Sequence, residues 1–235
     1  MMHKSELRTF KEYSDIINNL ALNDGIILYR GQSTNYPLLP SVVRDNPSFD
    51  STKIEQSMLS ELQRQTQLKV ATKLKNNAWD WLVYAQHFGM KTRLLDWTSN
   101  PLTALWFACS NEYKMKEDSY VYIFIADKDY LVDKTKSPFT IPQTRILRPS
   151  LNNERIIAQG GWFTAHKYSK TKKCFVPIEK NNMLNDKIIQ VKVPFKLKPE
   201  ILKRLNVFGI NSQALFPDIT GVCTYLNWLY KDKFK

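Results

Sequence analysis

The chain has 235 residues, of which 43% are hydrophobic and 24% are charged, so it is long enough to bury a sizeable core. Lys and Arg number 34 against 22 Asp and Glu, and the net charge of +12 favours polyanionic partners, although a solubilising lysine surface would give the same balance. No apolar run is long enough to cross a bilayer, and residues 1–15 lack the apolar core of a signal peptide. We therefore expect a cytoplasmic protein with no membrane partner.

The first half of the chain predicts three helices and a short strand. Apolar residues recur with helical spacing over 5–22, so residues 1–23 are expected to form a helical lead-in. The apolar run at 26–29 predicts a buried strand. The amphipathic pattern over 52–75 and the apolar run at 78–88, which ends before a glycine, predict two further helices.

The second half mixes strands and helices. Segment 92–100 predicts a strand or a tight turn, and Pro101 suits the first residue of the helix that follows. The β-prone runs at 120–126 and 187–193 predict two more strands, with further helices after them. Because this order shows no regular βαβ alternation, we predict an α+β fold in a single domain (1–235), with small mixed or antiparallel sheets and surrounding helices.

The chain lacks several common catalytic and metal-binding motifs. It has no GxxxxGK[ST] phosphate loop, GxGxxG fingerprint, GxSxG elbow or HExxH motif. The three cysteines form no CxxC pair, which suits a reducing compartment. The histidines (His3, His87, His166) stand far apart, whereas a zinc site needs ligands at close spacing, so we expect no metal.

Polar residues occur where a core should be apolar, and Arg30 is the first of them. It lies at the mouth of the strand predicted at 26–29. A guanidinium at such a position can hold a phosphate or a carboxylate through its planar fork of donors. A structural salt bridge is the alternative.

The window QHFGMKTRLLDWTSN (86–100) places many polar side chains among large apolar ones, which favours the lining of a pocket over packing alone. An internal ion pair between Arg93 and Asp96 is one alternative, and a His87 that is hydrogen-bonded in the core is another. The polar residues are Gln86, His87, Thr92, Arg93, Asp96, Thr98 and Ser99.

A glutamate, Glu154, follows a turn and precedes two isoleucines. We expect a strand here that delivers the carboxylate to a pocket, and a glutamate facing solvent from an edge strand is the alternative. In the later segment 209–226, Asn211 and Ser212 precede an apolar run, and we interpret them as turn and capping residues.

Four segments, taken in chain order, resemble the FRG domain, a family named for its Phe/Tyr-Arg-Gly motif. The match runs in order from about residue 24 to residue 228, and the block QHFGMKTRLLDWT is long and specific. The segments are LYRGQSTNYPLLPSVVR (28–44), QHFGMKTRLLDWTSNPLTALWFA (86–108), NNERIIAQGGWF (152–163) and GINSQALFPDITGVCTYL (209–226).

Three parts of these segments also resemble mono-ADP-ribosyltransferases of the Arg-Ser-Glu type. YRG (29–31) is similar to that family's aromatic-Arg-Gly strand, and WTSNPLTALWFA (97–108) is similar to its Ser-Thr-Ser strand and helix. ERIIAQGGWF (154–163) is similar to its glutamate followed by aliphatic residues, a glycine and a phenylalanine. Asn152 takes the place of the Gln or Glu that is usually tied to arginine as acceptor. The resemblance implies a cleft for NAD, with NAD as the substrate.

The resemblance also implies roles for individual residues. Glu154 would be the catalytic carboxylate beside the ribose, because cleavage of the glycosidic C–N bond passes through an oxocarbenium-like state. Arg30 would neutralise the pyrophosphate as the second catalytic residue, Asp96 would support Arg93, and Trp97 or Trp162 would stack on a ring. The expected cofactor-binding residues are Arg30, Gln32, His87, Arg93, Thr98, Ser99 and Gln159.

The lysine-rich loop KYSKTKK (167–173) and the net charge of +12 favour a nucleic-acid acceptor, with RNA favoured over DNA. Lysines would contact phosphates and an aromatic ring would stack on an exposed base, whereas a solvated loop is the alternative. The candidate nucleic-acid contacts are Lys167, Tyr168, Lys170, Lys172 and Lys173.

We therefore expect an NAD-dependent ADP-ribosyltransferase that modifies nucleic acid and acts as a bacterial toxin or antiphage defence effector, with an antitoxin protein as a further partner. Two alternatives stay open. The protein could be an NAD glycohydrolase that uses water as the acceptor, or a non-catalytic module that senses a nucleotide or a nucleic acid. Direct RNA cleavage is disfavoured because the sequence shows no His pair suited to acid–base work.

Overall fold

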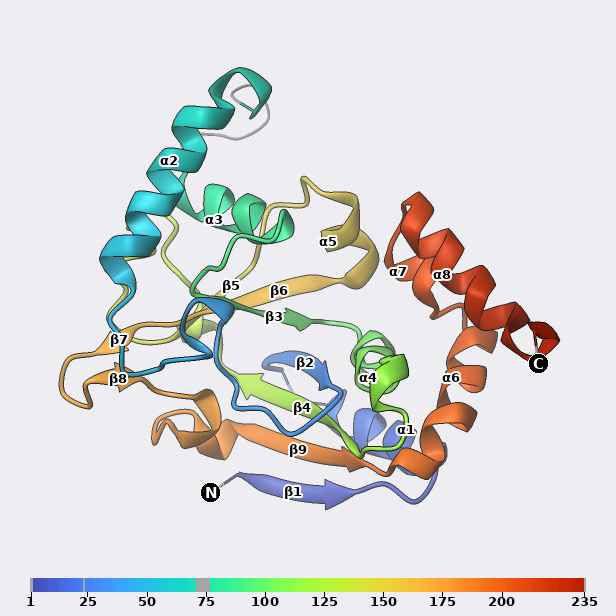
Figure 1. Cartoon of the computed structure of the whole chain (residues 1–235). Coiled ribbons are helices and arrows are strands. Elements are labelled where there is room, and N and C mark those ends of the chain that lie inside the picture. The colour runs from blue at the N-terminus through green and yellow to red at the C-terminus, as the bar shows by residue number, and fades with distance from the viewer. Residues whose placement is uncertain (1, 23, 71–76, 235) are drawn as a thin grey trace.

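The computed structural model describes residues 2–22, 24–70 and 77–234, which form an α+β fold around a seven-stranded mixed sheet (Figure 1). The α+β class is thereby confirmed. Strand β1 runs parallel to β9, and the other neighbouring strands of this sheet are antiparallel. In spatial order the strands are β1 (His3–Glu6), β9 (Ile188–Val193), β4 (Ser119–Ala126), β2 (Ile26–Gln32), β3 (Leu94–Thr98), β6 (Gly161–Ala165) and β5 (Arg145–Leu147).

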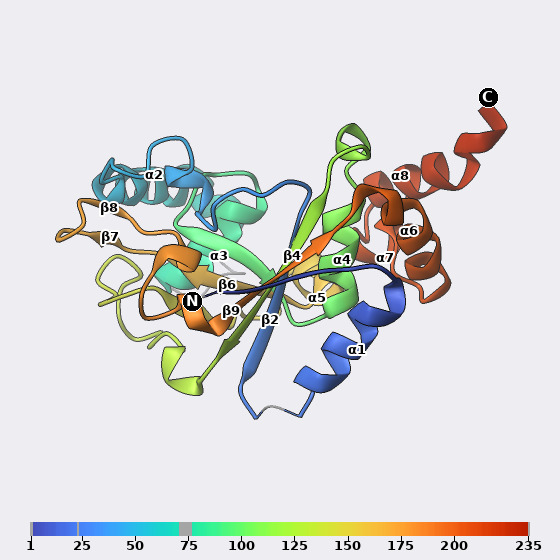
Figure 2. The same ribbon diagram turned by 90° about the horizontal axis from the view of Figure 1, so that it is seen from below.

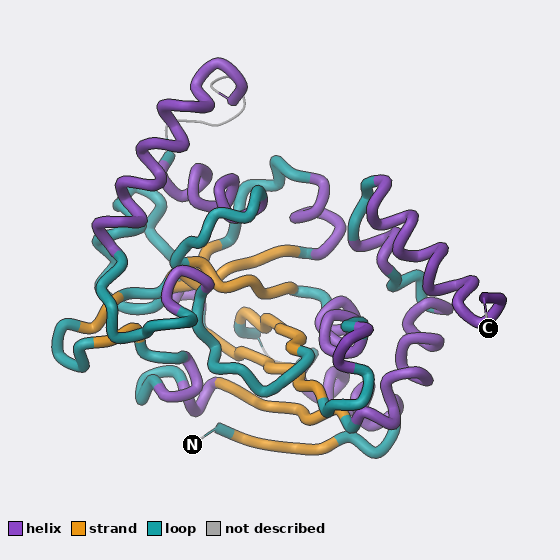
Figure 3. The backbone as a smooth tube through the Cα atoms, in the orientation of Figure 1, coloured by secondary structure: helices purple, strands orange, loops and turns teal. Residues whose placement is uncertain are grey.

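The helices lie around this central sheet, as the tube in Figure 3 shows. A separate two-stranded hairpin forms between β7 (Tyr168–Ser169) and β8 (Cys174–Phe175). The helices are α1 (Phe10–Leu20), α2 (Thr52–Val70), α3 (Ala78–His87), α4 (Pro101–Cys109), α5 (Glu154–Gln159), α6 (Lys198–Val207), α7 (Ser212–Leu215) and α8 (Ile219–Tyr230).

The helices fall into two groups, which lie on opposite sides of the view in Figure 2. Helices α1, α4 and α6 bury one apolar cluster against strands β2, β4 and β9. Helices α2 and α3 bury a second cluster against β3, β5 and β6. Because each group covers a different set of strands, the surface between the groups is left for a cavity over the middle of the sheet.

Helix α4 approaches strand β2 very closely because Gly31 has no side chain. A Cβ at this position would lie 1.9 Å from the Ala104 carbonyl oxygen and 2.5 Å from the Ala108 nitrogen. The glycine of the Tyr-Arg-Gly motif is therefore required by the packing of the helix on the strand.

Several predicted elements are confirmed. The runs at 26–29, 120–126 and 187–193 are strands, and segment 92–100 contains strand β3. Pro101 is the first residue of α4, where Asn100 caps the helix by accepting a hydrogen bond from the Leu102 nitrogen at 2.9 Å.

One expected element boundary and the expected size of the sheets were wrong. Residues 3–6 form the edge strand β1, and the first helix begins only at Phe10, after the capping residue Thr9. The four strand residues are all exposed, so no apolar alternation marked them as a strand. The main sheet is also larger than the small sheets that we expected. Helix α2 is described to Val70, and the remainder of the helix predicted over 52–75 lies outside the described residues.

Candidate functional site

A cavity of about 390 Å³ opens between the two groups of helices. Its walls come from strands β2, β3 and β6, from helices α3, α4 and α5, and from Phe216 after α7. Ligand pockets in proteins usually measure roughly 300–1,000 Å³, so the cavity is large enough for a small molecule. Each of the four segments singled out in the sequence contributes side chains to this one cavity.

The sheet separates at this point because β2 and β3 pair only where Tyr29 faces Thr98. Continuing the register would place Gly31 opposite Asp96. At that point the two strands are joined by the side chain of Arg30, and not by a further backbone pair. Nη1 of Arg30 donates to the Asp96 carbonyl oxygen at 2.7 Å and lies 3.9 Å from Oδ2 of the same residue. Arg30 therefore holds the two strands together at the cavity.

Arg30 has donor capacity left for an anion. Its Nε is buried and has no hydrogen-bond partner among the described residues. Burial lowers the pKa of Arg30 and the neighbouring Arg44 lowers it further, whereas Asp96 acts in the opposite direction. An arginine keeps its charge under such shifts because its ordinary pKa is far above neutral pH.

Asp96 is held in place by a chain of polar contacts that starts on helix α3. The side-chain nitrogen of Gln86 donates to Oδ1 of Asp96 at 2.7 Å. The side-chain oxygen of Gln86 accepts a hydrogen bond from the Thr92 hydroxyl. This contact fixes which end of the Gln86 amide faces the carboxylate. The side chain of Asp96 is still 65% exposed, so its oxygens stay available to a ligand.

Helix α5 supplies the opposite wall. Arg155 makes two contacts to Oδ2 of Asp218, from Nε at 3.3 Å and from Nη2 at 2.6 Å, and its guanidinium lies 5.2 Å from the centre of the Phe216 ring. His87 also lines the cavity. Desolvation and the charge of Arg155 lower the pKa of this histidine, whereas Asp218 raises it. The wall thus carries one paired cation and a neutral imidazole at neutral pH.

Aromatic rings complete the lining. Phe107 from α4, Trp162 from β6 and Phe216 all border the cavity. Flat apolar surfaces next to arginine donors suit a ligand that combines aromatic rings with phosphate groups.

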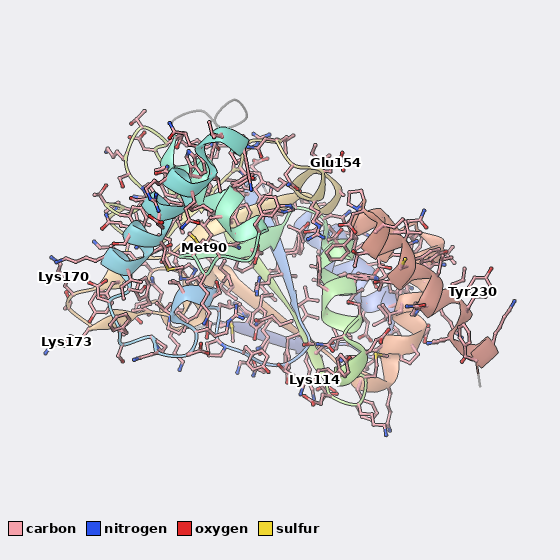
Figure 4. The ribbon with its side chains drawn as sticks, turned by 45° about the horizontal axis from the view of Figure 1, so that its top comes forward. Met90, Lys114, Glu154, Lys170, Lys173 and Tyr230 are labelled. Atoms are coloured by element: carbon pink, nitrogen blue, oxygen red, sulfur yellow. The ribbon has the colours of Figure 1, made fainter. Side chains whose placement is uncertain are left out.

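Glu154 does not line the cavity, although it was the predicted catalytic carboxylate. It is the exposed first residue of a helix rather than part of a strand, and Figure 4 shows it on α5 at the outer edge of the molecule. Asn153 caps this helix by accepting from the Arg155 nitrogen at 2.8 Å, and Gly160 ends it with a φ of 57°. An Asn before and a Gly after the run ERIIAQ are the helix signals that the strand interpretation overlooked.

The helical turn explains why Arg155 was missed as a site residue. Successive residues of an α-helix point about 100° apart, so Arg155 can face the cavity while Glu154 faces solvent. Gln159, four residues after Arg155, lines the cavity as expected, and its side-chain nitrogen donates to the Leu215 carbonyl oxygen at 3.0 Å.

Arg93 is a structural residue, and its expected place in the pocket was wrong. Its side chain is 1% exposed and pairs with Glu55 of α2, with Nε at 2.7 Å from Oε2. Burial raises the pKa of Glu55, and the contacts with Arg93 oppose this shift. The ion pair expected between Arg93 and Asp96 is therefore absent, and Asp96 interacts with Arg30 and Gln86 instead.

The remaining cofactor-binding candidates divide between the cavity and its surroundings. Thr98 lines the cavity, but its hydroxyl is used to donate to the Gln159 carbonyl oxygen at 2.5 Å and to accept from the Asn100 nitrogen at 2.9 Å. Gln32 and Ser99 do not line it. Gln32 donates to the Tyr36 carbonyl oxygen at 2.9 Å, and the Ser99 hydroxyl donates to that of Gly160 at 3.3 Å.

The two tryptophan candidates also differ. Trp162 borders the cavity and lies beneath the guanidinium of Arg148, at 5.5 Å. Trp97 touches the cavity but is only 3% exposed, and its Nε1 donates to the Thr164 hydroxyl at 3.0 Å. Trp162 is therefore the ring available for stacking.

The lysine-rich loop forms the β7–β8 hairpin and lies far from Glu154, as the labels of Lys170 and Lys173 in Figure 4 show. A second cavity, of about 330 Å³, is lined by three of its lysines together with polar groups. The three lysines are Lys167, Lys170 and Lys172.

Tyr168 is less available than we expected. Its ring packs edge-on against Phe175 at 5.6 Å, and its hydroxyl donates to the Ser48 carbonyl oxygen at 3.4 Å. The aromatic ring of the hairpin therefore contributes to packing, and the lysines are the groups that could meet a phosphate.

Two further findings concern the described residues only. No group of three or more His, Cys, Asp and Glu side chains among them is arranged to hold a metal ion. None of the helices described is both long and apolar enough to cross a membrane.

Comparison with known proteins gives one match. Searches of curated proteins and of solved structures found nothing similar to the chain. The model of the FRG domain family matches residues 25–117, which span β2 to α4 and include Arg30, Gln86, Asp96 and Thr98 of the cavity. Over this segment, which is less than half of the chain, the protein is similar to the FRG domain family.

Proposed function

We propose that the protein is an ADP-ribosyltransferase that takes NAD as its substrate. One observation carries the proposal: four segments far apart in the sequence meet at a single cavity that combines arginine donors with aromatic rings. The polar Arg30 from β2 and the ring of Trp162 from β6 lie on the walls of the same space.

The chemistry of NAD fits these walls. A dinucleotide has two aromatic bases and a central pyrophosphate, so it needs flat apolar surfaces and at least one cation. Arg30 is the better pyrophosphate ligand because its Nε has no partner among the described residues, whereas Arg155 already pairs with Asp218. Phe107, Trp162 and Phe216 offer the rings for a base.

The acceptor that we propose is nucleic acid, with RNA favoured over DNA. The net charge of +12 supports this, as does the hairpin cavity lined by three lysines. A toxin or antiphage effector, held silent by an antitoxin protein, is the biological role that we propose for such an activity.

Labelled NAD tests the proposed function directly. The purified protein is incubated with NAD that carries a label in the adenosine moiety, together with separate pools of RNA, DNA and protein. Label on RNA is the expected result. Free labelled ADP-ribose alone would instead identify an NAD glycohydrolase, and unchanged NAD in every pool would refute the enzymatic proposal.

A non-catalytic nucleotide sensor is the second candidate, and one observation favours it. The predicted catalytic carboxylate, Glu154, lies outside the cavity. Calorimetry separates this candidate from the first, because a sensor would bind NAD or a related nucleotide without releasing nicotinamide.

A further inference from the structure

We propose that Asp96, rather than Glu154, is the carboxylate that faces the reacting ribose of NAD. This inference rests on the proposed function and names the catalytic residue within it. Glu154 was assigned from the sequence, and the structure separates the two carboxylates, because Asp96 lines the cavity and Glu154 does not.

Asp96 is the only carboxylate among the described residues that line the central cavity. It lies on β3, next to the point where β2 and β3 separate. Glu154, by contrast, is on the exposed first turn of α5 and its helical neighbour Arg155 takes the inward position. A carboxylate must be close to C1′ of the ribose to stabilise positive charge there, so only the cavity position can serve.

The surroundings of Asp96 orient it as a catalytic group requires. Oδ1 accepts from Gln86 at 2.7 Å, and Oδ2 lies 3.9 Å from Nη1 of Arg30. With the side chain 65% exposed, the contacts fix its direction without covering it. The same Arg30 is the proposed ligand for the pyrophosphate, which would bring the adjoining ribose close to Asp96.

Gln86 is a positioning residue for this carboxylate. Its side-chain oxygen accepts from Thr92, so that its nitrogen points to Asp96. Preorganised contacts of this kind avoid the cost of reorienting the carboxylate during the reaction.

The reaction that Asp96 would assist is balanced without a further reagent. The bond between C1′ and the nicotinamide nitrogen breaks heterolytically, and both electrons leave with nicotinamide, which departs as a neutral molecule. The Asp96 carboxylate stabilises the positive charge on C1′ and the ring oxygen. A nucleophilic oxygen or nitrogen of the acceptor then forms the new bond to C1′, and one proton is released to solvent.

The test compares Asp96→Asn with the wild type by nicotinamide release and by calorimetric binding of NAD. We expect release to fall at least about 100-fold, while NAD affinity changes less than about threefold, because the carboxylate acts mainly on the charge that develops in the transition state. Asp15→Asn, an exposed change of the same type on α1, is the matched control and should keep the wild-type rate. Glu154→Gln is measured in parallel as the competing assignment.

The outcomes separate this inference from the proposed function. Wild-type protein that releases no nicotinamide would overturn both. Wild-type release combined with less than a tenfold loss in Asp96→Asn would overturn the inference alone, as would a loss explained by weaker NAD binding. Circular dichroism verifies that each variant is folded, and Asp96→Ser serves as a second, smaller substitution judged by the same tenfold limit.

Discussion

Single side chains decide which of the predicted polar residues act in structure and which can act on a ligand. Arg30 and Arg93 are both arginines close to a strand, and the sequence alone does not distinguish them. Arg93 uses its donors on Glu55 and on nearby backbone and hydroxyl groups, whereas the Nε of Arg30 has no partner among the described residues. A buried arginine whose donors are all paired, such as Arg93, is a structural residue. An arginine beside a cavity with an unpaired donor, such as Arg30, is a candidate ligand-binding residue.

The buried pair of Glu55 and Arg93 gives a prediction about stability. Replacing Glu55 by Gln removes a charge that is 0% exposed and leaves the guanidinium without its counter-ion. We expect the free energy of unfolding in urea to fall by about 3–5 kcal/mol. Glu200→Gln, which breaks an exposed pair with Arg204, is the control and should cost less than about 1 kcal/mol. Equal losses in the two variants would contradict the structural role of Arg93.

His166 gives a prediction about pH. It is 1% exposed, and burial together with the charges of Arg30 and Arg93 lowers its pKa to about 3. Because the folded pKa lies below the value of about 6.5 in an unfolded chain, the unfolded state binds more protons between these two values. The contribution of His166 to stability is therefore complete above about pH 6.5 and is lost as the pH falls towards the folded value.

The measurement is the difference between two unfolding curves as a function of pH. As the pH is lowered from 6 to 4, the free energy of unfolding of the wild type should fall more steeply than that of His166→Gln. The difference between the two slopes should be about 1.4 kcal/mol per pH unit. Parallel curves for the wild type and His166→Gln would show that this imidazole does not titrate as proposed.

At the level of elements, capping residues mark where a helix begins and ends even when the helix is too short for its periodicity to be recognised. Helix α4 was predicted correctly because Pro101 marks its first residue. Helix α5 was taken for a strand because its apolar pair resembles a strand, although Asn153 and Gly160 bracket it as capping residues do. Six residues are too few to show helical periodicity, so only the caps could have identified it.

The cap of α5 gives the next prediction. Asn153→Ala removes the side chain that accepts from the Arg155 nitrogen, and we expect a loss of about 1 kcal/mol in the free energy of unfolding. Because Arg155 lies in the first turn of α5 and lines the cavity, the affinity for NAD should fall as well. Asn153→Ser restores an acceptor at this position and should recover both quantities. If Asn153→Ala keeps its affinity for NAD, the start of α5 does not position the wall.

At the level of the whole molecule, the sequence predicted the α+β class and the strands β2, β4 and β9, because buried apolar runs determine them, and it predicted a strand or a tight turn where β3 lies. It left open whether Arg30, Thr98 and Glu154 converge, and in the structure Arg30 and Thr98 line one cavity whereas Glu154 does not. What it could not supply is the direction of each side chain. The pairing of Arg93 with Glu55 links α2 to β3, and such a contact between distant elements leaves no periodic signal.

The distribution of charge gives the last prediction. A basic protein attracts RNA through its overall field, whereas a binding site does so through particular lysines. The double variant Lys170→Gln/Lys172→Gln and the double variant Lys231→Gln/Lys233→Gln both reduce the net charge from +12 to 12 − 2 = +10, but the first removes lysines of the hairpin cavity and the second removes lysines at the C-terminal end.

If the hairpin contacts the phosphates, the two variants should differ in the salt dependence of RNA binding. Each contact with a single strand contributes about 0.7 to the slope of log K against log salt concentration, so the hairpin variant should lose about 1.4 and the C-terminal variant almost nothing. Fluorescence anisotropy with a labelled single-stranded RNA over a salt series measures both slopes. Equal slopes would mean that the charge of the whole molecule, rather than the hairpin, accounts for the attraction.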